Sequence, residues 1–373
     1  MRGHHFFMQI LFDYSIFFHQ KHGGISRYFL NIYEEFVNRK IDTKILAPIH
    51  SNTFLKDSSC KSKLNFYVKR YPKNTRKLFK FYNQTITDLY LKIYKPDVLH
   101  KTFYEKNLNK NKKVKKVLTV MDLAHEIYYK DYGFNENFRH KKLSIQNLDQ
   151  IICASNQTKK DFLNYYDFPE KKIDVVYMGA EQFINCKIIE LNEIDGPFLL
   201  YVGQRGKYKN FINLLKAYNL SKNLKKDFKL VCFGGGKFTK EEHELFKKDN
   251  LNTNNLFQLD GDDNKLLSLY RGASAFIYPS IIEGLGLPPL EAMLQGCPVI
   301  TSNHPAILEA VDVAAETFDP FDLEDIKQKI EKVLYDKIYK EALIKKGFKQ
   351  SKLFTWNKCA SETLEVYNKI QIK

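Results

Sequence analysis

The chain has 373 residues, of which 44% are hydrophobic and 14% aromatic, a composition that argues against disorder. Its length suits two domains rather than one. Its 59 lysines and arginines exceed the 43 aspartates and glutamates, and the formal charge of +16 favours a polyanionic partner: nucleic acid, an anionic membrane surface or a phosphorylated substrate.

Hydropathy and cysteine usage predict a soluble cytoplasmic protein. No uninterrupted apolar run approaches the roughly 20 residues of a membrane-spanning helix. The N-terminal MRGHHFFMQILFDYS has no small-residue cleavage site after its short apolar run. The six cysteines form no CxxC pair and no zinc-spaced cluster with histidine, which fits reduced thiols and argues against a structural metal.

Short apolar runs alternate with amphipathic stretches along the chain. In the first half, we predict buried parallel strands at 8–14, 43–49, 97–103, 115–122 and 150–155, with helices at 25–40 and 74–94. In the second half, we predict strands at 197–203, 228–235, 255–261, 275–280 and 298–303, again separated by helical stretches.

Two such sets predict two doubly wound, Rossmann-like α/β domains. We place the N-terminal domain at 1–180, a polar linker at 181–196 and the C-terminal domain at 197–354. The last segment, 355–373, has helical spacing and is free to dock on either domain, including back on the N-terminal one. Ligands of such sheets bind beyond the carboxyl ends of the strands, so four stretches at these ends are candidate sites.

The first candidate is the glycine turn after the first strand. Gly23 and Gly24 open a helix, where free backbone N–H groups can receive a phosphate or a sugar hydroxyl. The alternative is a plain turn with Ser26 as a local cap.

The second candidate is YVGQRGKYKNF, residues 201–211. Arg205 and Lys209 can clamp a diphosphate, because arginine supplies a planar fork and lysine a point charge. No GxxxxGK[ST] P-loop fits this stretch, and FGGGKF (233–238) does not fit the dinucleotide fingerprint GxGxxG. The alternative is a solvated basic turn.

The third candidate is PSIIEGLGLPPLEAMLQGCPVITSN, residues 279–303. Pro289 suits the first turn of a short helix, so Glu283 lies on the preceding loop and Glu291 in about the first helical turn. Carboxylates accept paired hydrogen bonds from sugar hydroxyls, and Gly284 and Gly286 leave backbone amides open to a ligand. Alternatively, Glu291 only complements the helix dipole.

The fourth candidate is TVMDLAHE, residues 119–126. Asp122, His125 and Glu126 could act on an acceptor hydroxyl or orient a donor, although a single histidine at a strand end is often structural.

An Asp-x-Asp pair, Asp260 and Asp262, could suggest a metal site. We expect helix capping instead, because Asp262 or Asp263 immediately precedes an amphipathic stretch.

Together these motifs resemble the retaining glycosyltransferases of family 4, which have the GT-B fold of two Rossmann-like domains facing across a cleft. Residues 279–303 resemble the family's Glu-x7-Glu signature, LYVGQRGKYKNF its donor-diphosphate loop, and GGISRYF its N-terminal glycine turn. Three further stretches follow the family's order: ICASNQTKKDF (152–162), VVYMGAE (175–181) and LLSLYRGASAFIYPS (266–280). The resemblance covers nearly the whole chain.

The resemblance also implies roles for the candidate residues. Arg205 and Lys209 would hold the donor diphosphate and act in catalysis with Glu283. The implied donor-binding residues are Gly24 for the phosphates, Gly284, Leu285 and Gly286 for the sugar with Glu283, and Glu291 for the ribose. Asp122 and His125 would lie on the acceptor side or orient the donor. No metal or other cofactor is implied beyond the nucleotide-sugar co-substrate.

Two positions depart from the family pattern. Met121 stands where many relatives have histidine or an aromatic residue, which affects the acceptor side. The segment LEAVDVAAETFDP (308–320) lacks the glycine usual after its glutamate, which affects the shape of that loop.

The implied activity is sugar transfer from a UDP- or GDP-linked donor to a glycan or lipid-linked acceptor, in surface polysaccharide or lipopolysaccharide assembly. The stretch KRYPKNTRKLFKFYNQ (69–84) interleaves basic and aromatic residues. Such a segment could rest on the inner face of an anionic membrane, or it could be an ordinary solvated basic face.

Two other readings compete with this one. A non-enzymatic nucleic-acid-binding module would explain the charge but not the glutamate pair, so we expect no nucleic-acid partner. A degenerate scaffold on the same fold is disfavoured by the intact set Arg205, Lys209, Glu283 and Glu291.

Overall fold

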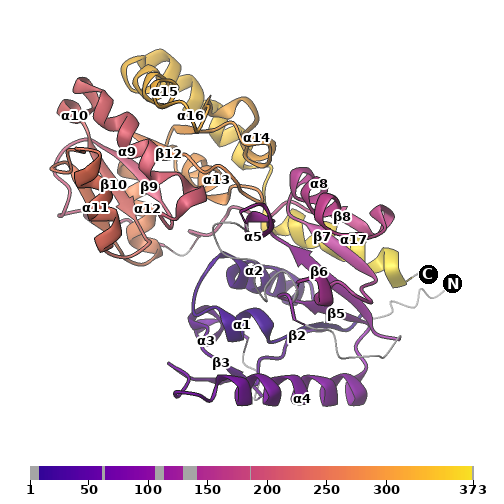
Figure 1. Ribbon diagram of the computed structural model, residues 1–373. Coiled ribbons are helices and arrows are strands. Elements are labelled where there is room, and N and C mark those ends of the chain that lie inside the picture. The colour runs from indigo at the N-terminus through magenta and orange to yellow at the C-terminus, as the bar shows by residue number, and fades with distance from the viewer. Residues whose placement is uncertain (1–7, 61–63, 106–112, 129–140, 185, 372–373) are drawn as a thin grey trace. The chain divides into compact units, whose positions relative to one another are not determined.

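The computed structural model describes residues 8–60, 64–105, 113–128, 141–184 and 186–371. Residues 1–7, part of the segment examined for a leader peptide, lie outside this description. The chain forms two compact units (Figure 1). Unit 1 comprises Met1–Met178 and Trp356–Lys373, and unit 2 comprises Gly179–Thr355.

Unit 1 is built on a six-stranded parallel sheet of order β2-β1-β5-β6-β7-β8. Its strands are β1 (Ile10–Phe12), β2 (Thr43–Ile45), β5 (Val98–Lys101), β6 (Lys115–Val120), β7 (Gln150–Cys153) and β8 (Ile173–Val175). Its helices are α1 (Ser15–His19), α2 (Gly24–Asn38), α3 (Thr53–Asp57), α4 (Arg76–Tyr94), α5 (Ala124–Ile127), α8 (Asn156–Tyr165), η1 (Glu170–Lys172) and α17 (Trp356–Gln371). A small parallel pair, β3 (Ile49–His50) and β4 (Phe66–Tyr67), stands apart from this sheet.

Unit 2 is built on a second six-stranded parallel sheet, of order β11-β10-β9-β12-β13-β14. Its strands are β9 (Phe198–Val202), β10 (Lys229–Phe233), β11 (Leu256–Leu259), β12 (Ala275–Tyr278), β13 (Val299–Ser302) and β14 (Glu316–Phe318). Its helices are η2 (Lys207–Lys209), α9 (Phe211–Leu220), α10 (Lys222–Asp227), α11 (Lys240–Lys248), α12 (Asp263–Gly272), α13 (Leu287–Leu294), α14 (Pro305–Val311), η3 (Asp312–Ala314), α15 (Leu323–Tyr335) and α16 (Lys337–Ser351). The predicted fold class, two Rossmann-like α/β domains, is confirmed.

The C-terminal helix α17 packs in unit 1, against α2. The Trp356 ring meets Tyr28 edge-on at 6.0 Å between centroids, and the Tyr367 ring meets Phe36 in the same way at 6.0 Å. Arg39 at the end of α2 donates to Ser361 Oγ at 2.9 Å. Buried aromatic contacts of this kind fix the helix in place.

The segment predicted as a linker belongs to unit 2. Its described residues form neither helix nor strand, but they bond to residues of α12. The backbone N–H of Ile189 donates to Ser268 Oγ at 2.8 Å, and Glu193 pairs with Lys265 at 2.6 Å. Asp262 caps α12 by accepting a hydrogen bond from the N–H of Lys265, as the sequence predicted.

The segment that lacks the usual glycine keeps a glycine-like backbone. Asp312, directly after α14, has φ +47° and ψ −130°, in a region that side chains rarely adopt. The chain therefore makes this turn without the usual glycine, and Asp312 adopts a strained backbone conformation.

Two buried histidines make the stability of unit 1 sensitive to acid. His100 in β5 is fully buried between Tyr367 Oη and Thr119 Oγ1. Burial lowers its pKa to about 3, and burial likewise lowers the pKa of His50 to about 4. Their folded pKa values lie below the unfolded value of about 6.5, so each neutral imidazole contributes stability above that pH and loses it as pH falls toward the folded value.

We expect the free energy of unfolding to fall below pH 6.5 by up to about 1.4 kcal/mol per pH unit for each histidine. Urea unfolding at pH 7, 6 and 5 measures this slope. The variant His100→Gln should show a shallower slope, by about one proton, than the wild type. Equal slopes in the two proteins would contradict the assignment.

Candidate functional site

The candidate site of unit 2 lies where the strand order reverses. β9 and β12 are neighbours in the centre of the sheet, but the chain continues from β9 toward β10 on one side and from β12 toward β13 on the other. Loops that leave neighbouring strands in opposite directions open a crevice at the carboxyl edge. The two loops are tied together where the N–H of Ile281 donates to the carbonyl of Tyr208 at 2.8 Å.

Lys209 from the β9 loop and Glu283 from the β12 loop meet at this point. Lys209 Nζ lies 2.5 Å from Glu283 Oε1, and the hydroxyl of Tyr278 donates to the same oxygen at 2.6 Å. The side chains of Lys209 and Glu283 are 19% and 13% exposed, so a ligand can reach both. The structure therefore brings together two residues that lie far apart in the sequence and that the sequence assigned to one donor.

Tyr278 was missed by the sequence analysis. Burial, reinforced by the neighbouring Glu283 carboxylate, raises the pKa of Tyr278 well above its usual value, so the hydroxyl stays protonated and donates to Glu283. The YPS sequence at the end of a predicted strand was the available signal, because the last residue of such a strand lies at the carboxyl edge.

The loop after Glu283 turns directly into α13. Gly284 and Leu285 form the bend, and the Leu285 side chain is buried, so only its backbone can face a ligand. Gly286 is the N-cap residue with φ +92°, a left-handed conformation that favours glycine.

Glu291 is the fifth residue of α13, just beyond the first turn, close to where the sequence predicted it. The helix begins at Leu287 with Gly286 as its N-cap residue and has no acidic residue in its first turn, so Glu291 is not the cap of this helix. Glu291 is buried, and its Oε2 accepts a hydrogen bond from Tyr270 Oη at 3.1 Å. Burial raises the pKa of Tyr270 well above its usual value, so this hydroxyl also remains a donor.

Arg205 does not join the Lys209–Glu283 pair. Its guanidinium donates to both carboxylate oxygens of Glu242, at 2.7 and 3.2 Å, and to the carbonyls of Gly234 and Gly236, each at 3.0 Å. It also lies 4.5 Å from the centroid of the Phe238 ring, and its side chain is 3% exposed. In this arrangement Arg205 holds the loop after β10, and its role at the diphosphate stays a prediction.

The glycine run after β10 is therefore a cradle for Arg205. Gly234, Gly235 and Gly236 all have positive φ, and a Cβ atom on Gly235 would lie 2.9 Å from the guanidinium. The sequence excluded a dinucleotide fingerprint here but gave no sign of this arginine contact.

The Gln20 side chain is hydrogen-bonded to the glycine turn of unit 1. Gln20 Oε1 accepts from the N–H of Ser26 at 3.0 Å, and Ser26 Oγ donates to the carbonyl of Gly23 at 3.0 Å. Gly23 is the N-cap residue, so Ser26 is not the cap that the alternative reading expected. A Cβ atom on Gly24 would meet nothing within 4 Å, which leaves its backbone open to approach.

The residues after β6 divide between surface and core. Asp122 Oδ1 accepts from the N–H of Ala124 at 3.0 Å, and His125 on α5 is exposed. Glu126 is buried, where it pairs with Lys141 Nζ at 2.8 Å and accepts from Tyr166 Oη at 2.7 Å. Glu126 is thus a core residue and not a ligand-facing one.

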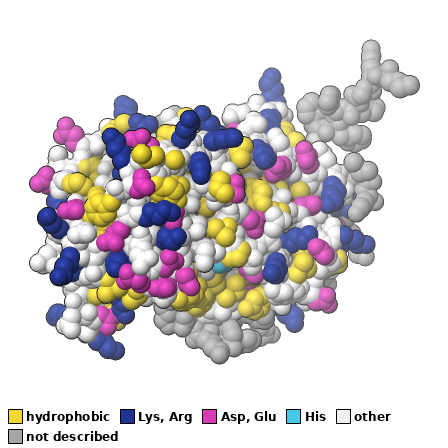
Figure 2. Space-filling view, turned by 90° about the horizontal axis from the view of Figure 1, so that it is seen from above, with side chains coloured by type: hydrophobic (Ala, Val, Ile, Leu, Met, Phe, Trp, Pro, Cys, Tyr) yellow, Lys and Arg dark blue, Asp and Glu magenta, His cyan; other side chains and the backbone are white. Residues whose placement is uncertain are grey.

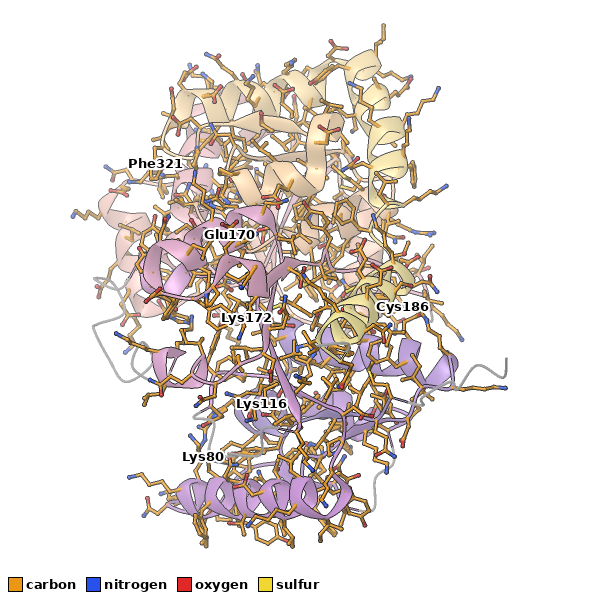
Figure 3. The ribbon with its side chains drawn as sticks, turned by 90° about the vertical axis from the view of Figure 1, so that its right-hand side faces the viewer. Lys80, Lys116, Glu170, Lys172, Cys186 and Phe321 are labelled. Atoms are coloured by element: carbon orange, nitrogen blue, oxygen red, sulfur yellow. The ribbon has the colours of Figure 1, made fainter. Side chains whose placement is uncertain are left out.

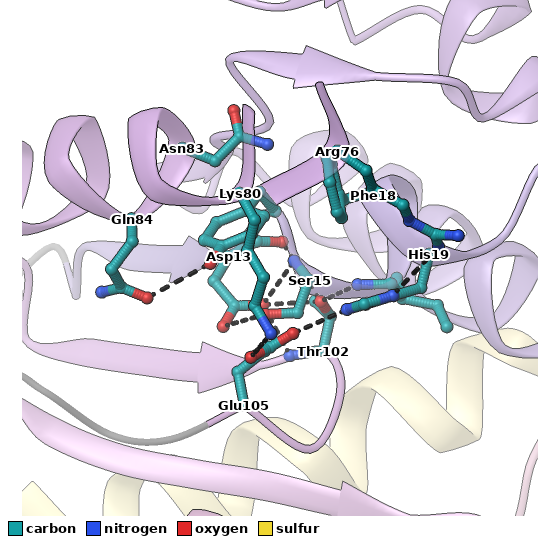
Figure 4. A network of polar contacts seen from close by, with 12 residues as sticks. Asp13, Ser15, Phe18, His19, Arg76, Lys80, Asn83, Gln84, Thr102 and Glu105 are labelled. Carbon is teal, nitrogen blue, oxygen red and sulfur yellow. Dashed lines mark hydrogen bonds and ion pairs between the residues drawn. The ribbon is translucent and has the colours of Figure 1, made fainter. Parts of the chain in front are cut away.

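A polar network at the carboxyl edge of unit 1 was also missed (Figure 4). It lies where β1 and β5 adjoin, at the reversal of strand order in this sheet. Glu105 accepts from His19 at 2.6 Å and pairs with Lys80 at 2.8 Å. Burial alone would raise the pKa of Glu105, but the hydrogen bonds from His19 and Lys80 lower it below its usual value, so the carboxylate stays charged.

Two family models match the chain in succession. The model described as Glycosyltransferase Family 4 matches residues 22–181, and Glycosyl transferases group 1 matches residues 187–350.

Curated relatives include bacterial mannosyltransferases. The serotype-specific mannosyltransferase WbdA of Escherichia coli is 26% identical over 265 residues, which are 66% of this chain and 32% of WbdA. The O-antigen chain mannosyltransferase B of Escherichia coli is 33% identical over 246 residues, which are 63% of this chain and 64% of that protein. The chain thus spans less than two thirds of the length of these relatives.

Solved structures share the fold along almost the whole chain. Sucrose-phosphate synthase from Thermosynechococcus elongatus has a TM-score of 0.77 at 18% identity and covers 98% of this chain and 99% of its own. Anabaena HepE in complex with UDP-glucose has a TM-score of 0.72 at 15% identity, with 96% and 99% covered. WaaG, a glycosyltransferase involved in lipopolysaccharide biosynthesis, has a TM-score of 0.71 at 16% identity, with 96% and 99% covered.

Proposed function

Because the chain belongs to the family 4 glycosyltransferases of the GT-B fold, we propose that it transfers a sugar from a nucleotide-diphosphate-sugar to a glycan or lipid-linked acceptor with retention of configuration. The names of its relatives point to O-antigen assembly and to mannose as the sugar, and a structural neighbour binds UDP-glucose. A UDP- or GDP-linked donor is therefore the co-substrate to test first.

The observation that carries this proposal is the Lys209–Glu283–Tyr278 cluster at the strand-order reversal of unit 2. Glu283 uses one carboxylate oxygen for both protein contacts, which leaves the other to accept hydrogen bonds from sugar hydroxyls. Lys209 supplies positive charge to the departing diphosphate, where a preorganised charge has its largest effect. We propose that this lysine serves without a metal ion.

The proposed retention comes from the family resemblance, and the contacts of Glu283 bear only on whether this carboxylate acts as a nucleophile. A carboxylate that already accepts hydrogen bonds from Lys209 and Tyr278 is a weak nucleophile. We therefore favour front-face attack, in which the acceptor hydroxyl approaches from the side of the leaving phosphate. Glu291 at the ribose, and Gly24, Asp122 and His125 in unit 1, keep the roles that the resemblance implies, as predictions.

Donor binding can be tested by thermal shift with UDP, GDP and their sugar conjugates in the presence of EDTA. A ligand present at 100 times its dissociation constant adds about 2.7 kcal/mol to the free energy of unfolding. One nucleotide family should therefore raise the melting temperature by roughly 5 °C or more. The shift should be lost in Lys209→Met and kept in Lys216→Met, the same change at a lysine on α9 that pairs with Asp249. No shift with any nucleotide would favour the scaffold reading.

A further inference from the structure

The inward side of helix α4 begins with two cations. Arg76 and Lys80 are four positions apart, so they share one side of the helix. The same stripe continues through the buried Asn83, Thr87 and Leu91, and Lys80 lies on the side of α4 that faces the rest of unit 1 (Figure 3). Cations on the inward side of a helix are costly without an anionic partner.

The protein supplies one carboxylate at this end of the helix. Lys80 Nζ lies 2.8 Å from Glu105 Oε2, and His19 Nε2 lies 2.6 Å from Glu105 Oε1 (Figure 4). A guanidinium nitrogen of Arg76 lies 3.4 Å from His19 Nδ1. Within the described parts of the chain, neither Arg76 nor the neighbouring Lys77 forms an ion pair with a carboxylate. One negative charge therefore faces three positive ones.

The cations line a pocket at the carboxyl edge of the unit 1 sheet. α1 follows β1 directly, and Glu105 follows β5, the strand beside β1. Ligands of open α/β sheets bind at this edge, where the strand order reverses. The pocket has a volume of about 600 Å³, which is typical of small-molecule sites. It is lined by Phe18, His19, Asn74, Arg76, Lys77 and Lys80.

The contacts around Arg76 hold its guanidinium without neutralising it. Its Cζ lies 5.6 Å from the centroid of the Phe18 ring, a distance at which a cation is attracted to an aromatic face. The Phe18 ring is itself held by Tyr71, whose hydroxyl donates to the Phe18 carbonyl at 3.1 Å. Arg76 is exposed, so its remaining N–H groups can reach a ligand. A fixed, charged guanidinium is preorganised to bind an oxyanion.

The charge of the pocket matches a phosphate group. With histidine counted as neutral, its three cations exceed the single charge of Glu105 by two. A phosphate monoester carries between one and two negative charges, whereas a carboxylate carries one. The face seen in Figure 2 has basic and acidic side chains intermixed, so the excess of cations at the pocket is not repeated across that face.

We propose that the sugar acceptor is a phosphorylated glycan and that this pocket, the α4 pocket, binds its phosphate. The fork of Arg76 and the point charge of Lys80 receive the phosphate oxygens, and the rest of the pocket holds the sugar that carries them. This inference rests on the proposed function, to which it adds the chemical class of the acceptor. Phosphate binding by the pocket can nevertheless be measured without transfer.

The form of the pocket favours a small ligand. A single-stranded nucleic acid binds along a groove of cations with aromatic side chains for its bases, whereas these cations converge on one pocket. A flat bilayer would meet the outward side of α4, where Leu78 and Phe81 are 62% and 70% exposed. These two residues lie on the opposite side of the helix from Arg76 and Lys80, so the same surface cannot contact both.

The test is calorimetric titration of the full chain with mannose 6-phosphate, inorganic phosphate and mannose. We expect the sugar phosphate to bind more tightly than inorganic phosphate and mannose not to bind. Arg76→Gln and Lys80→Met should each weaken binding of the sugar phosphate at least about tenfold, the effect of losing a hydrogen bond to a charged group. Lys92→Met, the same change at an exposed lysine in the last turn of α4, should bind as the wild type does.

Lys209→Met separates the α4 pocket from the donor site. It should leave binding of the sugar phosphate unchanged, whereas Arg76→Gln should keep the nucleotide-induced thermal shift. Equal melting temperatures without ligand will show that the variants fold. A wild type that binds the sugar phosphate but no nucleotide would contradict only the proposed donor.

Four results would overturn the assignment of the α4 pocket. They are no binding of the sugar phosphate, binding that survives both Arg76→Gln and Lys80→Met, binding that is lost in Lys209→Met, and inorganic phosphate bound as tightly as the sugar phosphate. The last of these would identify a site for the free ion rather than for an acceptor.

Discussion

Replacing Glu283 by glutamine is expected to lower the rate of sugar transfer by about 10²–10³-fold, the effect of removing one preorganised electrostatic partner from a reaction centre. Glutamine keeps the shape of the side chain but loses the charge that pairs with Lys209 at 2.5 Å and receives the Tyr278 hydroxyl. Lys209→Met should cause a loss of similar size, because the charge facing the leaving diphosphate disappears.

A loss of transfer activity in these two variants can be distinguished from a loss of folding by the melting temperature. The pair is partly exposed, and such pairs contribute about 1 kcal/mol or less to stability, so the melting temperatures should change little. If transfer by Glu283→Gln and Lys209→Met matched that of the control Lys216→Met, these residues would not belong to the reaction centre.

Replacing Arg205 is expected to lower the free energy of unfolding. Breaking a buried ion pair by deleting one partner costs about 3–5 kcal/mol, and Arg205 is almost completely buried against Glu242 and the carbonyls after β10. Arg205→Met should therefore lower the melting temperature by roughly 10 °C, measured by calorimetry and urea unfolding. Glu242→Gln should destabilise as well, and the double variant by less than the sum of the two.

This result separates two roles for the arginine. Arg271→Met, which removes a hydrogen bond to Gln295 at the surface, is a control that should cost little. If Arg205→Met kept full stability and lost only donor binding, Arg205 would hold the diphosphate as the family resemblance implies, and the contacts with Glu242 would be incidental.

Most of the sheet strands could be predicted from sequence because buried parallel strands read as apolar runs. In the two six-stranded sheets, the strands that were missed are short and contain an acidic residue: β8 is Ile173–Val175 with a central aspartate, and β14 begins with Glu316. Glu316 is buried because Lys329 and Lys332 pair with it, at 2.9 and 3.1 Å. Because these partners lie further along the chain, the sequence around Glu316 does not indicate a buried strand.

The sequence analysis named Lys209 and Glu283 as candidates, but it gave neither their pairing nor Tyr278. Arg205 and Lys209, four positions apart, would share a face on an α-helix. The turn before α9 is instead a short 3-10 helix, Lys207–Lys209, and the two side chains separate toward different partners. Glu283 lies beside Lys209 because β9 and β12 are neighbours in the sheet. The spacing of residues along the sequence does not reveal which strands are neighbours.

The orientation of α4 was likewise outside the reach of sequence patterns. Its helical spacing was clear, but aromatic and aliphatic residues occur on more than one side of it. The face that turns inward carries Asn83, whose amide bonds to both backbone groups of Ile49, together with the buried Thr87 and Leu91.

The most direct test of the central claim is a transfer assay with the wild-type chain. The nucleotide-sugar that gives the largest thermal shift is incubated, in EDTA, with anionic vesicles containing bacterial lipid-linked glycans, and the product linkage is assigned by NMR. We predict a new glycosidic bond with the anomeric configuration of the donor. An inverted product, or no product from a donor that binds, would contradict the assignment of a retaining glycosyltransferase.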